Sequence, residues 1–106
     1  MRGNAYGPEI RSALADLTAL ALERERSARL DGVSKAIGRW KRGRIGSDEA
    51  LEEVRRTAGG PEVSWHRDAD PGVPVAHAVA MGLLSRSDIP DRVWESIEIL
   101  VTLAGI

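Results

Sequence analysis

The chain has 106 residues, of which 42% are hydrophobic and 29% charged, and its formal net charge is −1. This length supports one modest core, and this balance is that of a folded rather than a disordered chain. The absence of cysteine excludes disulfides and thiolate chemistry. No stretch has signal-peptide character, and no apolar run reaches the ~20 residues of a membrane span. We therefore expect a cytoplasmic protein without a membrane partner.

The N-terminal part predicts a short tail followed by a long helix. Residues 1–7, with Gly3 and Gly7, predict a flexible tail. Pro8 suits the first position of a helix. Apolar residues then recur with the helical period and barely lose phase across Gly32, so we predict one helix over residues 8–42. The alternative is a break at Gly32, with the first helix ending near Arg29.

The next stretch predicts a helical hairpin. One face of the first helix carries an apolar stripe at steps of three, four and three residues, formed by Leu30, Val33, Ile37 and Trp40. Gly43 suits a left-handed C-terminal cap, and Ser47 can cap a second helix over residues 48–58. Gly59-Gly60-Pro61 would end that helix. We expect Trp40 to be a core residue rather than an exposed stacking platform.

The C-terminal half predicts two more helices after an irregular loop. The loop covers about residues 60–72, and Trp65 is expected to anchor it. A third helix is predicted over residues 73–85. Asp88 is expected to cap a fourth helix that ends at Gly105.

The predicted fold is therefore all-α, a small bundle of four main helices with a long first helix. We expect residues 8–106 to form a single helical domain. Ile99 and Leu103 lie partly off the apolar face of the fourth helix, which suggests a second packing surface.

The basic residues are concentrated in the predicted hairpin. Residues 35–44 carry five basic side chains and no acid, whereas residues 60–106 carry seven acids against three arginines. The uneven distribution matters more for partners than the net charge does. Either the basic segment faces an acidic part of the same fold or of a neighbouring subunit, or it faces a polyanion.

Nucleic-acid binding is the alternative function that this segment suggests. The candidate phosphate contacts are Lys35, Arg39, Lys41, Arg42, Arg44, Arg55 and Arg56. The turn at Gly43 is loosely similar to that of a helix-turn-helix. However, the second helix begins with Asp48 and Glu49, and such an acidic N-terminus would repel DNA where a recognition helix approaches the bases.

A metal-dependent site is the third candidate. His66, Asp68 and Asp70 alternate along the loop, and His77 could join them from the next helix. An imidazole and two carboxylates could ligate a divalent metal or act as an acid–base pair. The simpler interpretation is that the carboxylates cap the following helix, whose N-terminus attracts negative charge.

An interaction module accounts for more of the sequence than an active site does. The first and fourth helices are apolar beyond one face, and the segregated charges offer a complementary contact. We therefore expect a small soluble helical interaction or oligomerisation module without catalytic activity or cofactor. Its expected partner is itself, as a homo-oligomer, or another protein.

Overall fold

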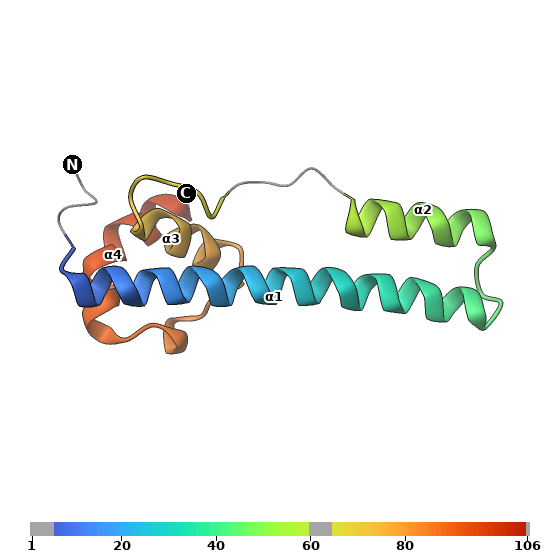
Figure 1. The fold of residues 1–106 in the computed structure, drawn as a ribbon, viewed down its shortest axis with the longest axis horizontal. Helices are drawn as coiled ribbons and strands as arrows, with labels where there is room; N and C mark the ends of the chain where they lie inside the picture. Colours follow the sequence, from blue (N-terminus) through green and yellow to red (C-terminus); the bar gives the residue numbers. More distant parts are fainter. Residues whose placement is uncertain (1–5, 60–64, 106) are drawn as a thin grey trace. The chain divides into compact units, whose positions relative to one another are not determined.

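The computed structural model describes residues 6–59 and 65–105 (Figure 1). All regular elements in these residues are helical: α1 (Pro8–Lys41), α2 (Ser47–Ala58), α3 (Gly72–Ala80), the 3₁₀ turn η2 (Arg86–Asp88) and α4 (Asp91–Ala104). The predicted all-α fold with four main helices and a long first helix is confirmed. The helix α1 continues through Gly32, so the alternative of a break there is wrong.

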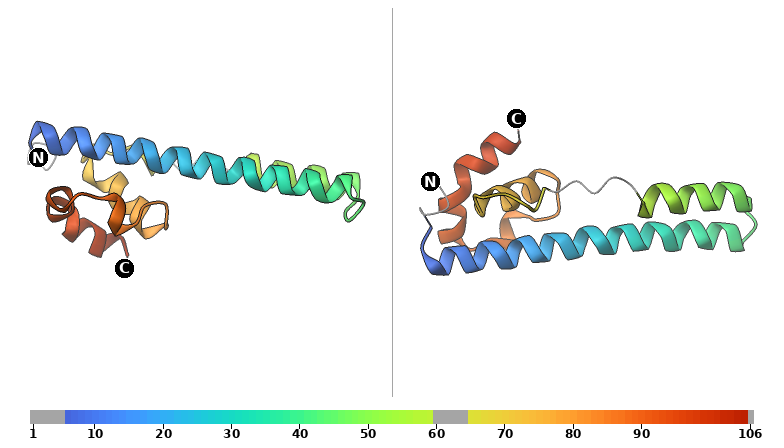
Figure 2. Two further views of the ribbon diagram at one scale, coloured as in Figure 1. Left: turned by 90° about the horizontal axis from the view of Figure 1, so that it is seen from below. Right: turned by 45° about the horizontal axis from the view of Figure 1, so that its top comes forward.

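The chain divides into two compact units. Unit 1 comprises Met1–Arg24 and Ser64–Ile106, and unit 2 comprises Glu25–Val63. The helix α1 contributes residues to both units, α3 and α4 belong to unit 1, and α2 belongs to unit 2 (Figures 1 and 2). The single domain over residues 8–106 stays a prediction, and its test is whether the two units unfold together.

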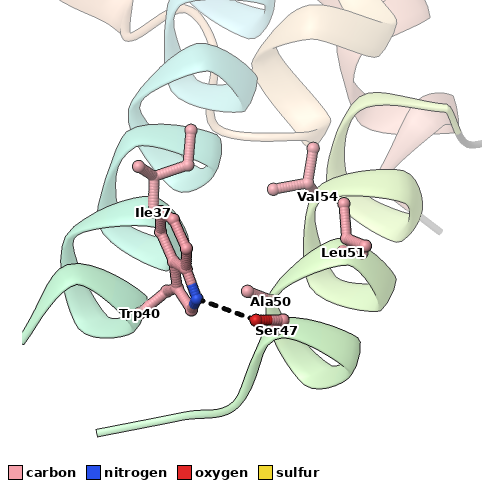
Figure 3. A pocket seen from close by; sticks show the side chains of 6 residues that line it. All are labelled: Ile37, Trp40, Ser47, Ala50, Leu51 and Val54. Carbon is pink, nitrogen blue, oxygen red and sulfur yellow. Dashed lines mark hydrogen bonds between the residues drawn. The ribbon is translucent and has the colours of Figure 1, made fainter. Parts of the chain in front are cut away.

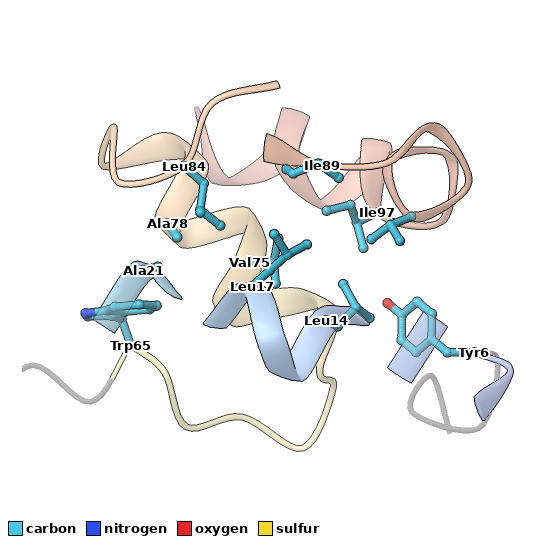
Figure 4. Close-up of a cluster of buried hydrophobic side chains, with 11 residues drawn as sticks. Tyr6, Leu14, Leu17, Ala21, Trp65, Val75, Ala78, Leu84, Ile89 and Ile97 are labelled. Atoms are coloured by element: carbon cyan, nitrogen blue, oxygen red, sulfur yellow. The ribbon is translucent and has the colours of Figure 1, made fainter. Parts of the chain in front are cut away.

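Unit 1 holds the main hydrophobic core. The first part of α1 packs against α3 and α4, and Figure 4 shows the aliphatic side chains meeting between them. The buried cluster consists of Tyr6, Leu14, Leu17, Ala21, Trp65, Val75, Ala78, Leu84, Ile89, Val93 and Ile97. Leu14, Val75 and Ile97 are completely buried. Burial of each such aliphatic side chain stabilises the fold by about 1.5–3 kcal/mol.

Two aromatic residues outside the helices join this core. Trp65 is buried, so the prediction that it anchors the loop is confirmed; residues 60–64 of that loop lie outside the described residues. Residues 1–5 of the expected tail lie outside them as well. Tyr6 differs from the flexible tail expected for residues 1–7, because its ring is buried and its hydroxyl donates to Asp70 Oδ1 at 2.9 Å.

The third helix is shorter than predicted. It ends at Ala80 rather than at Ser85, because Gly82 adopts a φ of 78°. The amide of Leu83 donates to the Ala78 carbonyl and the amide of Gly82 to the Val79 carbonyl, which is the Schellman pattern of a helix end. Gly82 is not predicted as a terminator from the sequence, since the apolar spacing continues past it.

The start of α4 also differs from the prediction. Asp88 does not cap this helix; Pro90 occupies the N-cap position, and α4 begins at Asp91. The Asp88 carboxylate instead accepts hydrogen bonds from the amide and hydroxyl of Ser85, which closes a capping box on η2. The predicted end at Gly105 is confirmed.

Unit 2 is an antiparallel hairpin of the last part of α1 and the whole of α2. Gly43 has a φ of 73°, and the amides of Gly43 and Arg44 donate to the carbonyls of Trp40 and Arg39. The predicted left-handed cap at Gly43 is therefore confirmed. Ser47 is not the N-cap of α2 as predicted; Gly46 takes that position, and the Ser47 hydroxyl has another partner, described below.

Candidate functional site

The hairpin of unit 2 carries an open apolar groove between its two helices (Figure 3). The hollow has a volume of about 350 Å³. Its lining residues are Ile37, Trp40, Ser47, Ala50, Leu51 and Val54. In Figure 3, Ile37 and Trp40 extend from α1 and Val54 and Leu51 from α2, with the hollow between them. We take this groove as the candidate functional site.

Small residues allow the two helices to approach closely beneath the groove. A Cβ added at Gly32 would lie 3.0 Å from the γ-methyl of Thr57, so α2 packs directly over the Gly32 backbone. Ala36, one helical turn further, is 1% exposed, and Ala50 on α2 is 8% exposed. Because the contact layer is built from glycine and alanine, the large apolar side chains are displaced to one face of the hairpin.

That face is exposed to a degree unusual for large hydrophobic side chains. Leu51 is 69% exposed and Leu30 70%, while Ile37 and Trp40 are 38% and 45% exposed. Ala36 and Ala50 are the only fully buried hydrophobic residues among the described residues of this unit. Ile37, Trp40 and Leu51 line the groove, whereas Leu30 lies beside a separate hollow near Ala58. Exposed large apolar side chains gathered around a groove are typical of an interaction site.

Trp40 is positioned by α2 rather than by a core. Its indole Nε1 donates to the Ser47 hydroxyl at 3.1 Å (Figure 3). The expectation that Trp40 is a core residue is wrong, because its side chain lines the groove and is 45% exposed. An indole held by its one polar atom, with its apolar surface exposed, suits binding of a second apolar surface.

Ion pairs fix several of the predicted phosphate-binding cations. Arg39 pairs with Glu53 across the two helices. Lys35 pairs with Asp31 at 2.9 Å within α1, and Arg55 pairs with Glu52 at 2.8 Å within α2. Within the basic segment of residues 35–44, Lys35 and Arg39 therefore face acidic groups of the same fold.

The remaining cations lie around the turn and at the end of α2. Lys41, Arg42, Arg44 and Arg56 are exposed, and none has a carboxylate partner in the part of the chain that the structure describes. The Arg42 guanidinium lies over the backbone of Gly38. The structure thus places three of the seven predicted cations together at the turn, and it does so beside the acidic first turn of α2.

The loop residues predicted as metal ligands have structural partners. Asp70 is 8% exposed, and its Oδ1 accepts hydrogen bonds from Tyr6 and from the Gly72 amide. Asp68 Oδ1 accepts one from the Asp70 amide. His66 stacks edge-on against Trp65, and its buried Nδ1 has no hydrogen-bond partner within residues 6–59 and 65–105.

These residues do not come together as ligands. Across residues 6–59 and 65–105, no three histidine, aspartate or glutamate side chains gather closely enough to hold a metal ion. His77, the expected fourth member, lies exposed on α3, beside a shallow apolar hollow. Each carboxylate accepts the amide two residues further along the chain, Asp68 from Asp70 and Asp70 from Gly72 at the start of α3. The N-cap of α3 is Pro71, so neither carboxylate caps this helix in the way the simpler interpretation of the sequence predicts.

Unit 1 also exposes apolar side chains. Ile99 is 70% exposed and Leu103 60%, on the face of α4 for which the sequence suggests a second packing surface. A hollow of about 360 Å³ lies beside Leu103, between α3 and α4. None of the helices in the described residues combines the length and apolar character needed to cross a membrane.

The groove itself was not predicted from the sequence. The stripe of Leu30, Val33, Ile37 and Trp40 is evident there, but its spacing alone favours a core. The signal that could have identified the groove is the scarcity of large apolar residues facing this stripe: Leu51 and Val54 are the only two in residues 46–59. The chain matches no protein-family model, no curated protein and no solved structure.

Proposed function

We propose that this chain is a non-catalytic helical interaction module and that the groove between α1 and α2 binds another helical surface. The observation that carries the proposal is the exposure of Trp40 and Leu51 around a hollow lined almost entirely by apolar side chains. An amphipathic helix fills such a groove with residues spaced at three and four positions.

The energetics of the hairpin support this role. In the described part of unit 2 the buried hydrophobic side chains are Ala36 and Ala50, so the two segments of the hairpin gain little hydrophobic stabilisation from each other. Covering Leu30, Leu51 and Trp40 would remove large apolar surfaces from water, each contributing on the order of 1–2 kcal/mol. Docking and folding of the hairpin are therefore coupled, with the bound state favoured.

Photo-crosslinking from the groove tests the proposal. The full chain would carry p-benzoylphenylalanine in place of Leu51, and in the matched control in place of Glu49. Glu49 lies two residues earlier, about 200° around α2, and so faces away from the groove. In cells that produce the chain, we expect irradiation to give one dominant adduct from position 51 and none from position 49.

The adduct should map to an apolar position of a single helix of the partner and should disappear in the Ile37→Glu background. Weak, scattered adducts of equal yield from both positions would overturn the proposed function. A homo-oligomer and a different protein partner are distinguished by the mass of the adduct. The cytoplasmic location expected from the sequence stays a prediction.

The observation that favours nucleic-acid binding as a second candidate is the group of exposed cations at the turn, Lys41, Arg42 and Arg44, which have no carboxylate partner among the described residues. Three phosphate contacts supply only weak, salt-sensitive binding. We therefore place this function second, and its test is given in the Discussion.

A further inference from the structure

We infer that the groove is occupied by the same hairpin of a second copy of the chain, packed antiparallel about a two-fold axis that passes close to Leu51 and Ile37. This inference rests on the proposed function, because it names the partner of that groove. It is carried by the order of charges along α2 and by the register of the two helices within the hairpin.

The charges at the two ends of α2 have opposite sign, so two copies of this helix attract each other at their ends when they pack antiparallel. Asp48 and Glu49 lie in its first turn, and Arg55 and Arg56 lie in its last turn. An antiparallel pair of α2 helices sets the acidic turn of each copy beside the basic turn of the other. A parallel pair would set acid against acid and base against base, which is unfavourable.

Leu51 lies at the centre of this charge pattern. Asp48 precedes it by three residues and Arg55 follows it by four, so both lie on the same side of the helix as Leu51. Residues flanking an apolar stripe in this way form the salt bridges between paired helices. Pairing Asp48 with the Arg55 side chain of the second copy puts the symmetry axis next to Leu51, whose exposed side chain then meets its own copy.

The existing Arg55–Glu52 contact leaves Arg55 available for this role. Arg55 and Glu52 are 76% and 55% exposed, and exposed pairs of this kind contribute little stability. Arg55 can therefore exchange one carboxylate for another, or bind both.

The register of the hairpin places an apolar residue of α1 at the same level. The contacts of Gly32 with Thr57 and of Trp40 with Ser47 fix which residues of the two helices lie side by side. Between these two contacts, Leu51 lies level with Ile37. The same axis therefore passes Ile37, and the antiparallel arrangement brings Trp40 next to the Val33 side chain of the second copy.

An interface generated by a two-fold axis uses the same patch on both copies. The groove meets this requirement, since its apolar stripe extends to both sides of Ile37 and the two charges that share the side of Leu51, Asp48 before it and Arg55 after it, have opposite sign. The result is a four-helix arrangement in which the large side chains of both hairpins form one core.

Disulfide mapping in the full chain tests the pairing, and the absence of native cysteine makes single substitutions unambiguous. We would prepare Asp48→Cys and Arg55→Cys separately and mix them under oxidising conditions. A disulfide requires Cα atoms within about 7 Å. In the antiparallel pair residue 48 meets residue 55, whereas the two copies of residue 48 are about 10 Å apart along the helix axis.

We expect the mixture to form the disulfide between position 48 of one copy and position 55 of the other at least ten times faster than either variant forms a dimer with itself. Lys35→Cys is the matched control, because Lys35 is two residues from Ile37 and about 200° around α1. This variant should give no covalent dimer. Sedimentation of the unsubstituted chain should show a dimer.

A charge exchange provides an independent measurement. Asp48→Arg should raise the dimer dissociation constant by about 10-fold, since it places like charges together twice in the dimer. Adding Arg55→Asp in the same chain should restore the constant, because the exchanged pair has the opposite order and the same attraction.

Two results would overturn the inference. If Asp48→Cys forms a disulfide with itself faster than with Arg55→Cys, the two α2 helices pair in parallel. If the chain sediments as a monomer up to 0.5 mM, which is ~500 times a micromolar dissociation constant, the partner is not a second copy. In the latter case, photo-crosslinking at position 51 separates the two claims. An adduct with a different protein would support the proposed function and contradict only the second copy as partner. The absence of any adduct would contradict both the proposed function and the second copy.

Discussion

The hydroxyl of Tyr6 donates a hydrogen bond of 2.9 Å to Oδ1 of Asp70, 64 residues further along the chain. The same oxygen accepts the amide hydrogen of Gly72 at 2.9 Å. Asp70 therefore links Tyr6, two residues before the start of α1, to the start of α3. A carboxylate that the sequence suggested as a metal ligand is a buried acceptor that holds two segments of unit 1 together.

Tyr6→Phe should destabilise the fold by about 1 kcal/mol, because it removes one hydrogen bond and keeps the buried ring. Asp70→Ala should cost more, about 2–3 kcal/mol, since it removes the acceptor of both hydrogen bonds. Urea unfolding followed by Trp fluorescence measures both. Equal stability of Asp70→Ala and the unsubstituted chain would contradict this role for Asp70.

The ion pair between Arg24 and Asp88 predicts a loss of stability in acid. Arg24 forms two hydrogen bonds to the carboxylate, at 2.9 and 3.1 Å, and the Ser85 amide adds a third. The Arg24 guanidinium and then the Ser85 amide hold the pKa of Asp88 far below its ordinary value of 3.8. Folding thus favours the ionised form, so this stabilisation is present above about pH 4 and is lost as the pH falls below it.

Thermal unfolding at pH 7 and at pH 2 checks this relationship. Asp88→Asn should lower the midpoint at pH 7, and the difference from the unsubstituted chain should shrink at pH 2. Asp16→Asn is a suitable control, because Asp16 is exposed on α1 and should leave the pH dependence unchanged. If Asp88→Asn lowers the unfolding midpoint by the same amount at pH 7 and at pH 2, the ionised Asp88 carboxylate is not the source of the acid sensitivity.

The contact between Gly32 and Thr57 predicts a coupled pair of substitutions. Alanine is favoured over glycine by about 1 kcal/mol within a helix, but its Cβ would lie only 3.0 Å from the Thr57 methyl. Gly32→Ala alone should therefore gain little or lose stability. In the Thr57→Ser background the methyl is absent, and the gain of about 1 kcal/mol should appear.

A double-mutant cycle on the free energy of unfolding measures this coupling. Additive effects of the two substitutions would show that α2 does not pack over Gly32 in solution. Additive effects would also contradict the alignment of Gly32 with Thr57, from which the position of the two-fold axis is inferred.

Hydrogen exchange should distinguish the two units at low concentration. The described part of unit 2 buries two alanines, whereas unit 1 buries a cluster of aliphatic and aromatic side chains. We expect α2 amides of the dilute chain to exchange at least ten times faster than those of α4, and their protection to rise with chain concentration. Identical protection that is independent of concentration would favour one cooperative domain without self-association.

Nucleic-acid binding should be weak. With Lys41, Arg42 and Arg44 as the unpaired cations of the turn, log K should fall with log salt with a slope of about −3 for duplex DNA. We expect a dissociation constant of about 10⁻⁴ M or weaker at physiological salt, measured by fluorescence anisotropy. Micromolar binding that is abolished by Arg42→Glu and Arg44→Glu would make the turn, rather than the groove, the principal site.

The predictions of the first helix and of its turn depend only on residues that are close together in the sequence. The helical spacing from Ile10 to Trp40 predicted α1 through Gly32, and Gly43 predicted the turn, because only a residue tolerant of positive φ closes that cap. The same rule applies at Gly82, where an apolar spacing that continues to Leu84 hides the end of the helix. Ser47 and Asp88 both stand where the sequence favours an N-cap. In the structure, the Ser47 hydroxyl accepts a hydrogen bond from the Trp40 indole, and the Asp88 carboxylate accepts one from the Ser85 amide.

The number of helices, the turn at Gly43 and the apolar stripe of α1 can be predicted from the sequence, since these depend on backbone preferences and on side-chain spacing. Which apolar stripe is buried depends on the tertiary structure. Unit 1 brings α3 and α4 over the first part of α1, so Leu14 is covered. In unit 2, α2 contacts α1 through Gly32 and Ala36 instead, which leaves Ile37 and Trp40 exposed. Periodicity defines a face of a helix, but the element that covers this face is set by contacts between residues distant in sequence.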